Sequence, residues 1–249
     1  MRPLFACWRE VAPRLASHRM IALFLDFDGT LVTIERHPEA VRVNPAARRT
    51  LAILARSTRF QVWVISARRR ADVRSRLRVP GVRYLGLYGW ERAPVVERPA
   101  GPIFHVKTFL AGSLPAHPCI WIEDKQHTIA VHYRGAPEAI RRAALERVQR
   151  VVAPWRPGLR IAPGKAVWEI LPTAFGGKGG AVRRELAALP GQTLPVYLGD
   201  DLSDEDAFAA LRHGIAIRVG TRCSTRARYQ LDGVGQVHHF LERLRMEFL

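Results

Sequence analysis

The chain has 249 residues, of which 48% are hydrophobic and 24% are charged, a composition typical of a globular protein with a full core. No apolar stretch approaches the roughly 20 residues of a membrane-spanning helix, and Arg9, Glu10 and Arg14 interrupt any signal-peptide core. We therefore expect a cytoplasmic protein without membrane contacts.

The formal net charge of +17 is the unusual bulk property of the chain. A charge of this sign favours association with polyanions such as nucleic acids. The arginines are spread over nearly every predicted helix, however, and no basic tail or nucleic-acid-binding motif is present. We expect no nucleic-acid partner, and the same charge would attract an anionic small molecule.

Residues 21–31 (Ile-Ala-Leu-Phe-Leu-Asp-Phe-Asp-Gly-Thr-Leu) predict a buried strand that ends in two carboxylates. Alternate residues of a strand share a face, so Asp26 and Asp28 point the same way at its carboxyl end, where open α/β sheets bind ligands. Crowded carboxylates repel one another unless a cation or a proton offsets their charge. Mg²⁺ suits such oxygen ligands, although an ordinary polar turn has the same appearance.

A helix and a second buried strand follow. Asn44 and Pro45 form a helix-start signal, and residues 60–65 predict a strand that ends at Ser66. The Ser66 hydroxyl could bind a phosphate oxygen or could cap the next helix. A third strand is expected at 83–88, and alternating strands and helices indicate a parallel sheet.

The pattern changes after residues 94–102, which are rich in proline and resemble a linker. Residues 119–125 and 128–134 then predict the two strands of a hairpin, and the helix that follows carries an apolar stripe that could cover one face. The other face is polar, with Glu123, Lys125, His132 and Arg134 on it.

This polar face has two interpretations. Antiparallel sheets commonly leave one face solvated. The presence of Trp121 beside charged groups instead suits a sugar, which has both hydroxyls and apolar ring faces. A further strand at 167–171 places Glu169 opposite to its neighbours Trp168 and Ile170.

Lys178 lies among four glycines at residues 176–180, at the start of a predicted helix. The segment does not match a phosphate-binding Walker loop, because Gly179 occupies the Ser/Thr position. A lysine there can reach a phosphate or Asp26, although a solvated lysine is the simpler alternative.

A core strand at 194–198 ends in a second acidic segment, with Asp200, Asp201 and Asp204. Three carboxylates at a strand end are unfavourable without a cation, so we expect Asp200 to bind a metal, with Asp201 or Asp204 behind it. Ser203 and Asp206 have the spacing of a capping box, so the outer acids also serve the next helix. A last strand is expected at 215–219, before a C-terminal amphipathic helix.

Four segments in this order resemble the loops of the haloacid dehalogenase superfamily of aspartate-nucleophile phosphatases: Asp26-Phe-Asp-Gly-Thr-Leu, Ser66, Lys178 and Gly199-Asp-Asp-Leu-Ser-Asp. The segments Trp121-Ile-Glu-Asp-Lys and Thr128-Ile-Ala-Val-His-Tyr-Arg are similar to the cap signature of the trehalose-6-phosphate phosphatase family. The chain departs from that family at Ala67, usually glycine, and at Tyr88, where a histidine is common.

The resemblance implies an α/β fold, with a Rossmann-like parallel-sheet core and an inserted smaller α/β cap domain. Residues 1–98 and 173–249 would form the core, and residues 99–172 the cap. It further implies a Mg²⁺-dependent phosphatase that acts on a small-molecule sugar phosphate, trehalose 6-phosphate. A related sugar-phosphate phosphatase, a phosphohexomutase or a basic nucleic-acid-binding protein are the alternatives.

The resemblance also assigns roles to residues. Asp26 would be the nucleophile and Asp28 the general acid and base, with Lys178 as the third catalytic group. Thr30, Ser66 and Lys178 would bind the phosphate. The implied metal ligands are Asp26, Asp28 and Asp200, supported by Asp201 and Asp204. The sugar would contact Glu123, Lys125, His132, Arg134 and Glu169 when the cap closes.

Overall fold

The computed structural model describes residues 1–35, 37–92, 101–221 and 224–249. Contacts divide the chain into a larger unit, residues 1–94 with 176–249, and a smaller unit, residues 95–175. The expected boundary between residues 98 and 99 lies outside the described residues. Both expected domain boundaries stay predictions.

The larger unit contains a seven-stranded sheet in which every described pairing is parallel, as expected. Its strands, in spatial order, are β1 (Arg2–Pro3), β11 (Tyr229–Leu231), β10 (Ile215–Val219), β9 (Leu194–Gly199), β2 (Ile21–Asp26), β3 (Phe60–Ile65) and β4 (Arg83–Leu85).

Strand β2 lies inside this sheet, between β9 and β3, and all six of its residues are buried. Leu23 and Leu25 pack into one apolar cluster and Ala22 and Phe24 into another, on opposite faces of the sheet. A strand covered on both faces needs an apolar sequence throughout, and this explains the continuous run that precedes Asp26.

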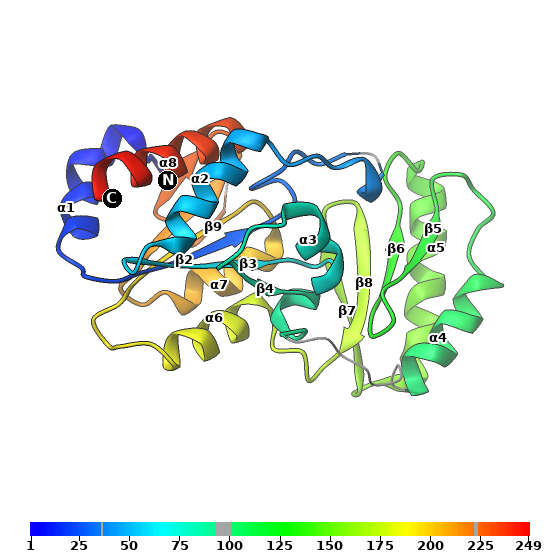
Figure 1. The fold of residues 1–249 in the computed structure, drawn as a ribbon. Helices are drawn as coiled ribbons and strands as arrows, with labels where there is room; N and C mark the ends of the chain where they lie inside the picture. Colours follow the sequence, from blue (N-terminus) through cyan, green and yellow to red (C-terminus); the bar gives the residue numbers. More distant parts are fainter. Residues whose placement is uncertain (36, 93–100, 222–223) are drawn as a thin grey trace. The chain divides into compact units, whose positions relative to one another are not determined.

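Helices cover both faces of the sheet (Figure 1). One face carries α1 (Trp8–Ala16), α2 (Pro45–Arg56), α3 (Arg70–Leu77) and α8 (Val234–Phe248). The other face carries α6 (Gly177–Ala187) and α7 (Glu205–Ala210). Short 3-10 turns are η1 (Phe5–Cys7), η2 (Pro38–Ala40), η3 (Leu87–Gly89) and η5 (Leu202–Asp204).

The start of α2 follows the sequence signal. The Asn44 side chain accepts hydrogen bonds from the backbone of Ala46 at 2.8 Å and of Ala47 at 3.3 Å, and Pro45 occupies the first turn. These contacts satisfy amide groups that a helix start otherwise leaves unpaired.

The smaller unit has a four-stranded antiparallel sheet in the order β5 (Trp121–Asp124), β6 (Ile129–His132), β8 (Val167–Pro172) and β7 (Leu159–Gly164). It also contains α4 (Gly101–Ala111), α5 (Glu138–Val152) and the 3-10 turn η4 (Ala153–Trp155). The predicted hairpin is confirmed with shorter strands. Val148 of α5 packs against Val131 and Ile170, so α5 covers the apolar face as expected. The α/β fold class is confirmed, with a parallel core sheet and a smaller inserted sheet.

Three expectations about elements were wrong. Gly101 and Pro102, expected in a linker, begin α4, where proline is tolerated because first-turn amides need no helical partner. The strand expected at 83–88 ends at Leu85. The strand at 215–219 is not the last, because β11 follows it and pairs with β1 at the sheet edge. Strands of two or three residues are too short to produce a periodic pattern.

No helix in the described part of the chain is both long and apolar enough to cross a bilayer.

We predict that Leu51→Ala destabilises the larger unit by about 2–5 kcal/mol, because Leu51 is fully buried between α2 and the sheet. Ile53→Ala is the matched control on the same helix: Ile53 is 44% exposed, and its truncation should change stability by less than about 0.5 kcal/mol. Urea unfolding of both variants checks the difference, and equal losses would contradict the packing described for α2.

Candidate active site

The first acidic loop, residues 27–31, follows β2 directly. Asp26, the last residue of β2, is buried, whereas the Asp28 side chain is one-third exposed. Gly29 of this loop has φ +81°, and a Cβ there would lie 2.2 Å from Oδ2 of Asp200, which follows β9. Only glycine therefore allows the Asp200 carboxylate to approach the loop this closely.

Lys178 joins three separate segments of the larger unit. Its Nζ donates to Asp26 Oδ1 at 2.7 Å and to Asp204 Oδ1 at 2.8 Å, and all three side chains are buried. Burial lowers the pKa of the Lys178 ammonium, but the charges of Asp204 and Asp26 outweigh it, so the net shift is upward. The residue is therefore a fixed cation, and the alternative of a solvated lysine is wrong.

Burial is the largest influence on Asp26 and raises the pKa of its carboxyl, while the charge of Lys178 opposes that shift. The charges of Asp204 and Asp200 raise the pKa further. The Lys178 ammonium thus contacts two of these three buried carboxylates, Asp26 and Asp204, and further positive charge would stabilise the ionised form of Asp26.

Asp26, Asp200 and Asp204 form a cluster of buried carboxylates, and one oxygen from each lies within 4.8 Å of the other two. Neither Asp28 nor Asp201, both predicted as metal-site residues, belongs to this cluster of the described residues. Such oxygen donors are the ligands that hard divalent cations prefer.

The second acidic loop, between β9 and α7, is built around Asp204. The Asp204 carboxylate accepts hydrogen bonds from Lys178, from the Tyr197 hydroxyl at 2.7 Å and from the Asp201 backbone amide at 2.8 Å. A Cβ on Gly199 would lie 2.2 Å from the Asp204 carboxyl carbon, so the loop needs glycine there. Asp204 therefore holds the loop and Lys178 together, and Asp201 forms a capping box with Asp204 at the start of η5.

The predicted phosphate-binding residues lie beside the ends of β2 and β3. Ser66 is buried, and its Oγ accepts from the Arg68 backbone amide at 3.1 Å. Arg69, not Ser66, is the N-cap residue of α3, so the helix-cap interpretation of Ser66 is wrong. The Thr30 amide lies 3.4 Å from the Phe27 carbonyl, and Thr30 Oγ1 is buried without a partner among the described residues.

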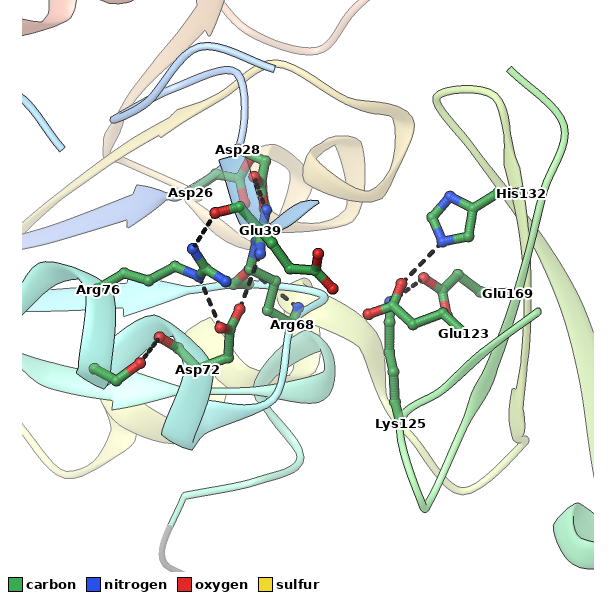
Figure 2. A network of polar contacts seen from close by, with 12 residues as sticks. Asp26, Asp28, Glu39, Arg68, Asp72, Arg76, Glu123, Lys125, His132 and Glu169 are labelled. Carbon is green, nitrogen blue, oxygen red and sulfur yellow. Dashed lines mark hydrogen bonds and ion pairs between the residues drawn. The ribbon is translucent and has the colours of Figure 1, made fainter. Parts of the chain in front are cut away.

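Arg68 also belongs to this site, although no sequence pattern described above predicts a role for it. Its Nε and Nη2 donate to the two oxygens of Asp28 at 2.7 and 2.8 Å, and Nη1 donates to Asp72 at 2.9 Å (Figure 2). The pairing with Asp28 is bidentate, the geometry in which a guanidinium holds a carboxylate most strongly. The spacing Ser66-Ala67-Arg68, close to the family's Ser-Gly-Arg, was the available signal.

Tyr88, at the position where the family often has histidine, has φ +60°, and its backbone amide donates to Ser66 O at 2.8 Å. The residue supports the turn that contains Ser66.

The smaller unit gathers most of the predicted sugar-binding residues on one face of its sheet. Glu123 and Glu169 both lie opposite Ala130 of β6, in its two neighbouring strands. Lys125 Nζ donates to Glu169 Oε1 at 2.6 Å, and both side chains are buried (Figure 2). A buried pair of this kind is costly to assemble unless its remaining polar atoms also find partners, and Glu169 Oε2 has none among the described residues.

The second polar pair of this sheet is Glu123 with His132, whose Nε2 lies 2.9 Å from Glu123 Oε2. The His132 ring stacks on Trp121, with centroids 3.8 Å apart and an interplanar angle of 6°. Arg134 is exposed, and its Nη2 donates to the Lys165 carbonyl at 3.1 Å, so it makes no described contact with the other four.

Comparison with known proteins shows what this chain is similar to. The family model described as trehalose-phosphatase matches residues 24–234. Proteins named trehalose-phosphate phosphatase are similar over most of the chain: that of Mycobacterium avium is 35% identical over 257 residues, and that of Mycobacterium tuberculosis strain H37Rv is 34% identical over 255. The alignments cover 90% and 91% of this chain and 61% of each relative, so the chain spans about three fifths of their length.

Solved structures show the same fold. The C-terminal domain of a C. albicans trehalose-6-phosphate phosphatase has a TM-score of 0.79 at 21% identity, and covers 95% of either chain. A trehalose-6-phosphate phosphatase of Aspergillus fumigatus has a TM-score of 0.65 at 26% identity, with 96% of this chain and 97% of that one covered. Together with the family match over most of its length, these similarities show that the chain belongs to the trehalose-phosphatase family.

Proposed function

We propose that the chain hydrolyses trehalose 6-phosphate to trehalose and phosphate, the last step of trehalose biosynthesis, through an aspartyl-phosphate on Asp26. The observation that supports this most is the buried Lys178 held between Asp26 and Asp204, beside Asp200. Such an arrangement presents a carboxylate nucleophile at a strand end and holds it in place by a buried ammonium. Family membership supports the substrate.

The cluster of Asp26, Asp200 and Asp204 fits a divalent cation. Its donors are carboxylate oxygens, all three residues are buried, and Lys178 contacts Asp26 and Asp204 among them. Mg²⁺ bound there would neutralise charge on the phosphoryl oxygens. We assign Asp26 and Asp200 as its direct protein ligands, together with the Asp28 backbone carbonyl. Asp201 and Asp204 support the loop behind them.

The reaction proceeds in two displacements. An Asp26 carboxylate oxygen forms a bond to phosphorus as the bond from phosphorus to the sugar oxygen breaks, and Asp28 gives the departing oxygen a proton. A water molecule then attacks phosphorus while Asp28 takes a proton from this water. The bond between phosphorus and the Asp26 oxygen breaks, which releases phosphate and regenerates Asp26. Covalent catalysis replaces one difficult step with two easier ones. Lys178 keeps the nucleophile in place, and Ser66, Lys178 and the Thr30 amide hold the phosphoryl group.

The Arg68 contact gives Asp28 a further requirement. Both Asp28 oxygens accept hydrogen bonds from one guanidinium. This bidentate contact fixes the orientation of the Asp28 carboxyl group. The contact with Arg68 must therefore loosen before an Asp28 oxygen can turn toward the departing sugar oxygen.

We assign recognition of the sugar to the polar face of the smaller unit. Glu123, Lys125 and Glu169 offer charged donors and acceptors to hydroxyl groups, and Arg134 adds a cation. The stacked pair of Trp121 and His132 adds a flat apolar surface of the kind that sugar rings contact. A panel of sugar phosphates separates this substrate from related ones, and retention of phosphate on the sugar would identify a mutase. The expected cytoplasmic location stays a prediction.

Asp26→Asn should lower the turnover of trehalose 6-phosphate at least about 10³-fold, because the amide cannot act as the nucleophile. The side-chain volume is nearly unchanged, so the fold should be retained. Asp232→Asn, an exposed carboxylate remote from this loop in the sequence, is the matched control and should retain activity. Phosphate release measures both. Asp26→Asn activity within tenfold of wild type would contradict the covalent mechanism.

Glu123→Ala should reduce kcat/KM for trehalose 6-phosphate by about 10–100-fold, since a charged hydrogen bond contributes about 1.5–3 kcal/mol. Hydrolysis of a small aryl phosphate should hardly change, because that substrate makes no contact with the sugar face. Asp124→Ala, the next residue on the opposite face of β5, is the control and should affect neither substrate. Equal losses on both substrates would show that Glu123 serves the fold or the chemistry.

The charge of +17 should give only non-specific nucleic-acid binding. We expect dissociation constants of about 10⁻⁴–10⁻⁶ M for duplex DNA, with a steep decrease in affinity as salt rises. Fluorescence anisotropy over a salt series measures this, and sequence-selective nanomolar binding at physiological salt would establish a nucleic-acid partner.

A further inference from the structure

Arg218 is a buried arginine at the carboxyl end of β10, in a strand whose other residues are apolar. It lies opposite Gly199 in the sheet, just before the second acidic loop begins. Its Nη1 donates to the Asp201 carbonyl at 2.9 Å, and its Nη2 donates to the Asp200 carbonyl. One guanidinium therefore binds two consecutive peptide groups of the loop that carries Asp200.

These two contacts restrain the segment that supplies a carboxylate to the cluster. The Asp201 amide is bound to Asp204, which also holds Lys178, so the loop is fixed from its amide side as well. Arg218 is held in turn by Glu205 of α7, at 3.7 Å. The Asp200 carbonyl and the Asp201 amide belong to the same peptide group, and both are bound. This peptide group therefore has little freedom to rotate, which restrains the backbone that carries the Asp200 side chain.

We infer that Arg218 is a positioning residue for the metal-binding loop: it keeps Asp200 oriented toward Asp26 and so strengthens Mg²⁺ binding without touching the metal. This inference rests on the proposed Mg²⁺ site. Groups that orient metal ligands in this way typically contribute about 10–100-fold to metal affinity.

The sign of the effect separates positioning from simple electrostatics. Arg218 is a cation near a cation site, so its charge by itself weakens Mg²⁺ binding. If charge dominated, Arg218→Met would bind Mg²⁺ more tightly. If positioning dominates, the same substitution binds Mg²⁺ more weakly, because the carbonyls of Asp200 and Asp201 lose the group that orients them.

The test is Mg²⁺ binding to the full chain without substrate, measured by calorimetry and by the rise in melting temperature with Mg²⁺ at constant ionic strength. Arg218→Met should weaken Mg²⁺ binding about 10–100-fold. Arg218→Lys, which keeps the charge but lacks the fork of donors, should bind Mg²⁺ with intermediate affinity. In turnover, the Mg²⁺ concentration for half-maximal rate should rise in parallel, and saturating Mg²⁺ should restore most of the rate.

Arg59→Met is the matched control. Arg59 Nη2 also donates to two consecutive carbonyls, Leu15 O at 2.9 Å and Ala16 O at 3.3 Å, but Arg59 precedes β3 at the opposite edge of the sheet. The Arg59→Met substitution should therefore leave Mg²⁺ binding unchanged.

Unchanged or tighter Mg²⁺ binding in Arg218→Met overturns the inference, as does an equal weakening in Arg59→Met. If Arg218→Met does not fold, wild-type Mg²⁺ affinity in Arg218→Lys overturns it. Absence of Mg²⁺ binding in the wild-type chain would instead refute the proposed metal site.

Discussion

The ion pair network of Lys178 with Asp26 and Asp204 is the interaction on which the site depends. The three residues belong to α6, β2 and the loop after β9, and their charges are removed from water together. Breaking a buried pair by removing one partner typically costs about 3–5 kcal/mol, because it leaves an uncompensated charge. The fold therefore holds the carboxylates in place by electrostatics as well as by packing.

The sheet order explains why these groups meet. Strand β2 lies between β9 and β3, its successor along the chain, and all three run parallel. Asp26, Ser66 and the loop that begins at Asp200 consequently leave the sheet at the same edge. The chain continues from β2 to β3 on one side, whereas β9 lies on the other side of β2. The strand order therefore reverses at β2, and open α/β sheets bind their ligands at the carboxyl ends of the strands at such a position.

Much of this arrangement is predictable because the relevant signals are local. Asp26, Lys178 and Asp200 each follow or begin an element with a clear apolar pattern, and parallel strands bring such ends together. Arg68 and Arg218 were not predictable in the same way. The chain has 39 lysines and arginines, and the arginine that binds the Asp200 carbonyl has no local mark that distinguishes it from the others. Arg68 is marked only by its spacing from Ser66, and that spacing does not indicate that its partner is Asp28. The distant pairing of β1 with β11 has no local signal either.

The measurement that tests the account most directly is phosphate release from trehalose 6-phosphate by the wild-type chain, with Mg²⁺ and with a chelator in excess. The account predicts rapid release that requires Mg²⁺, and free trehalose in equal amount. No release in the presence of Mg²⁺, or equal release with the chelator, would contradict it.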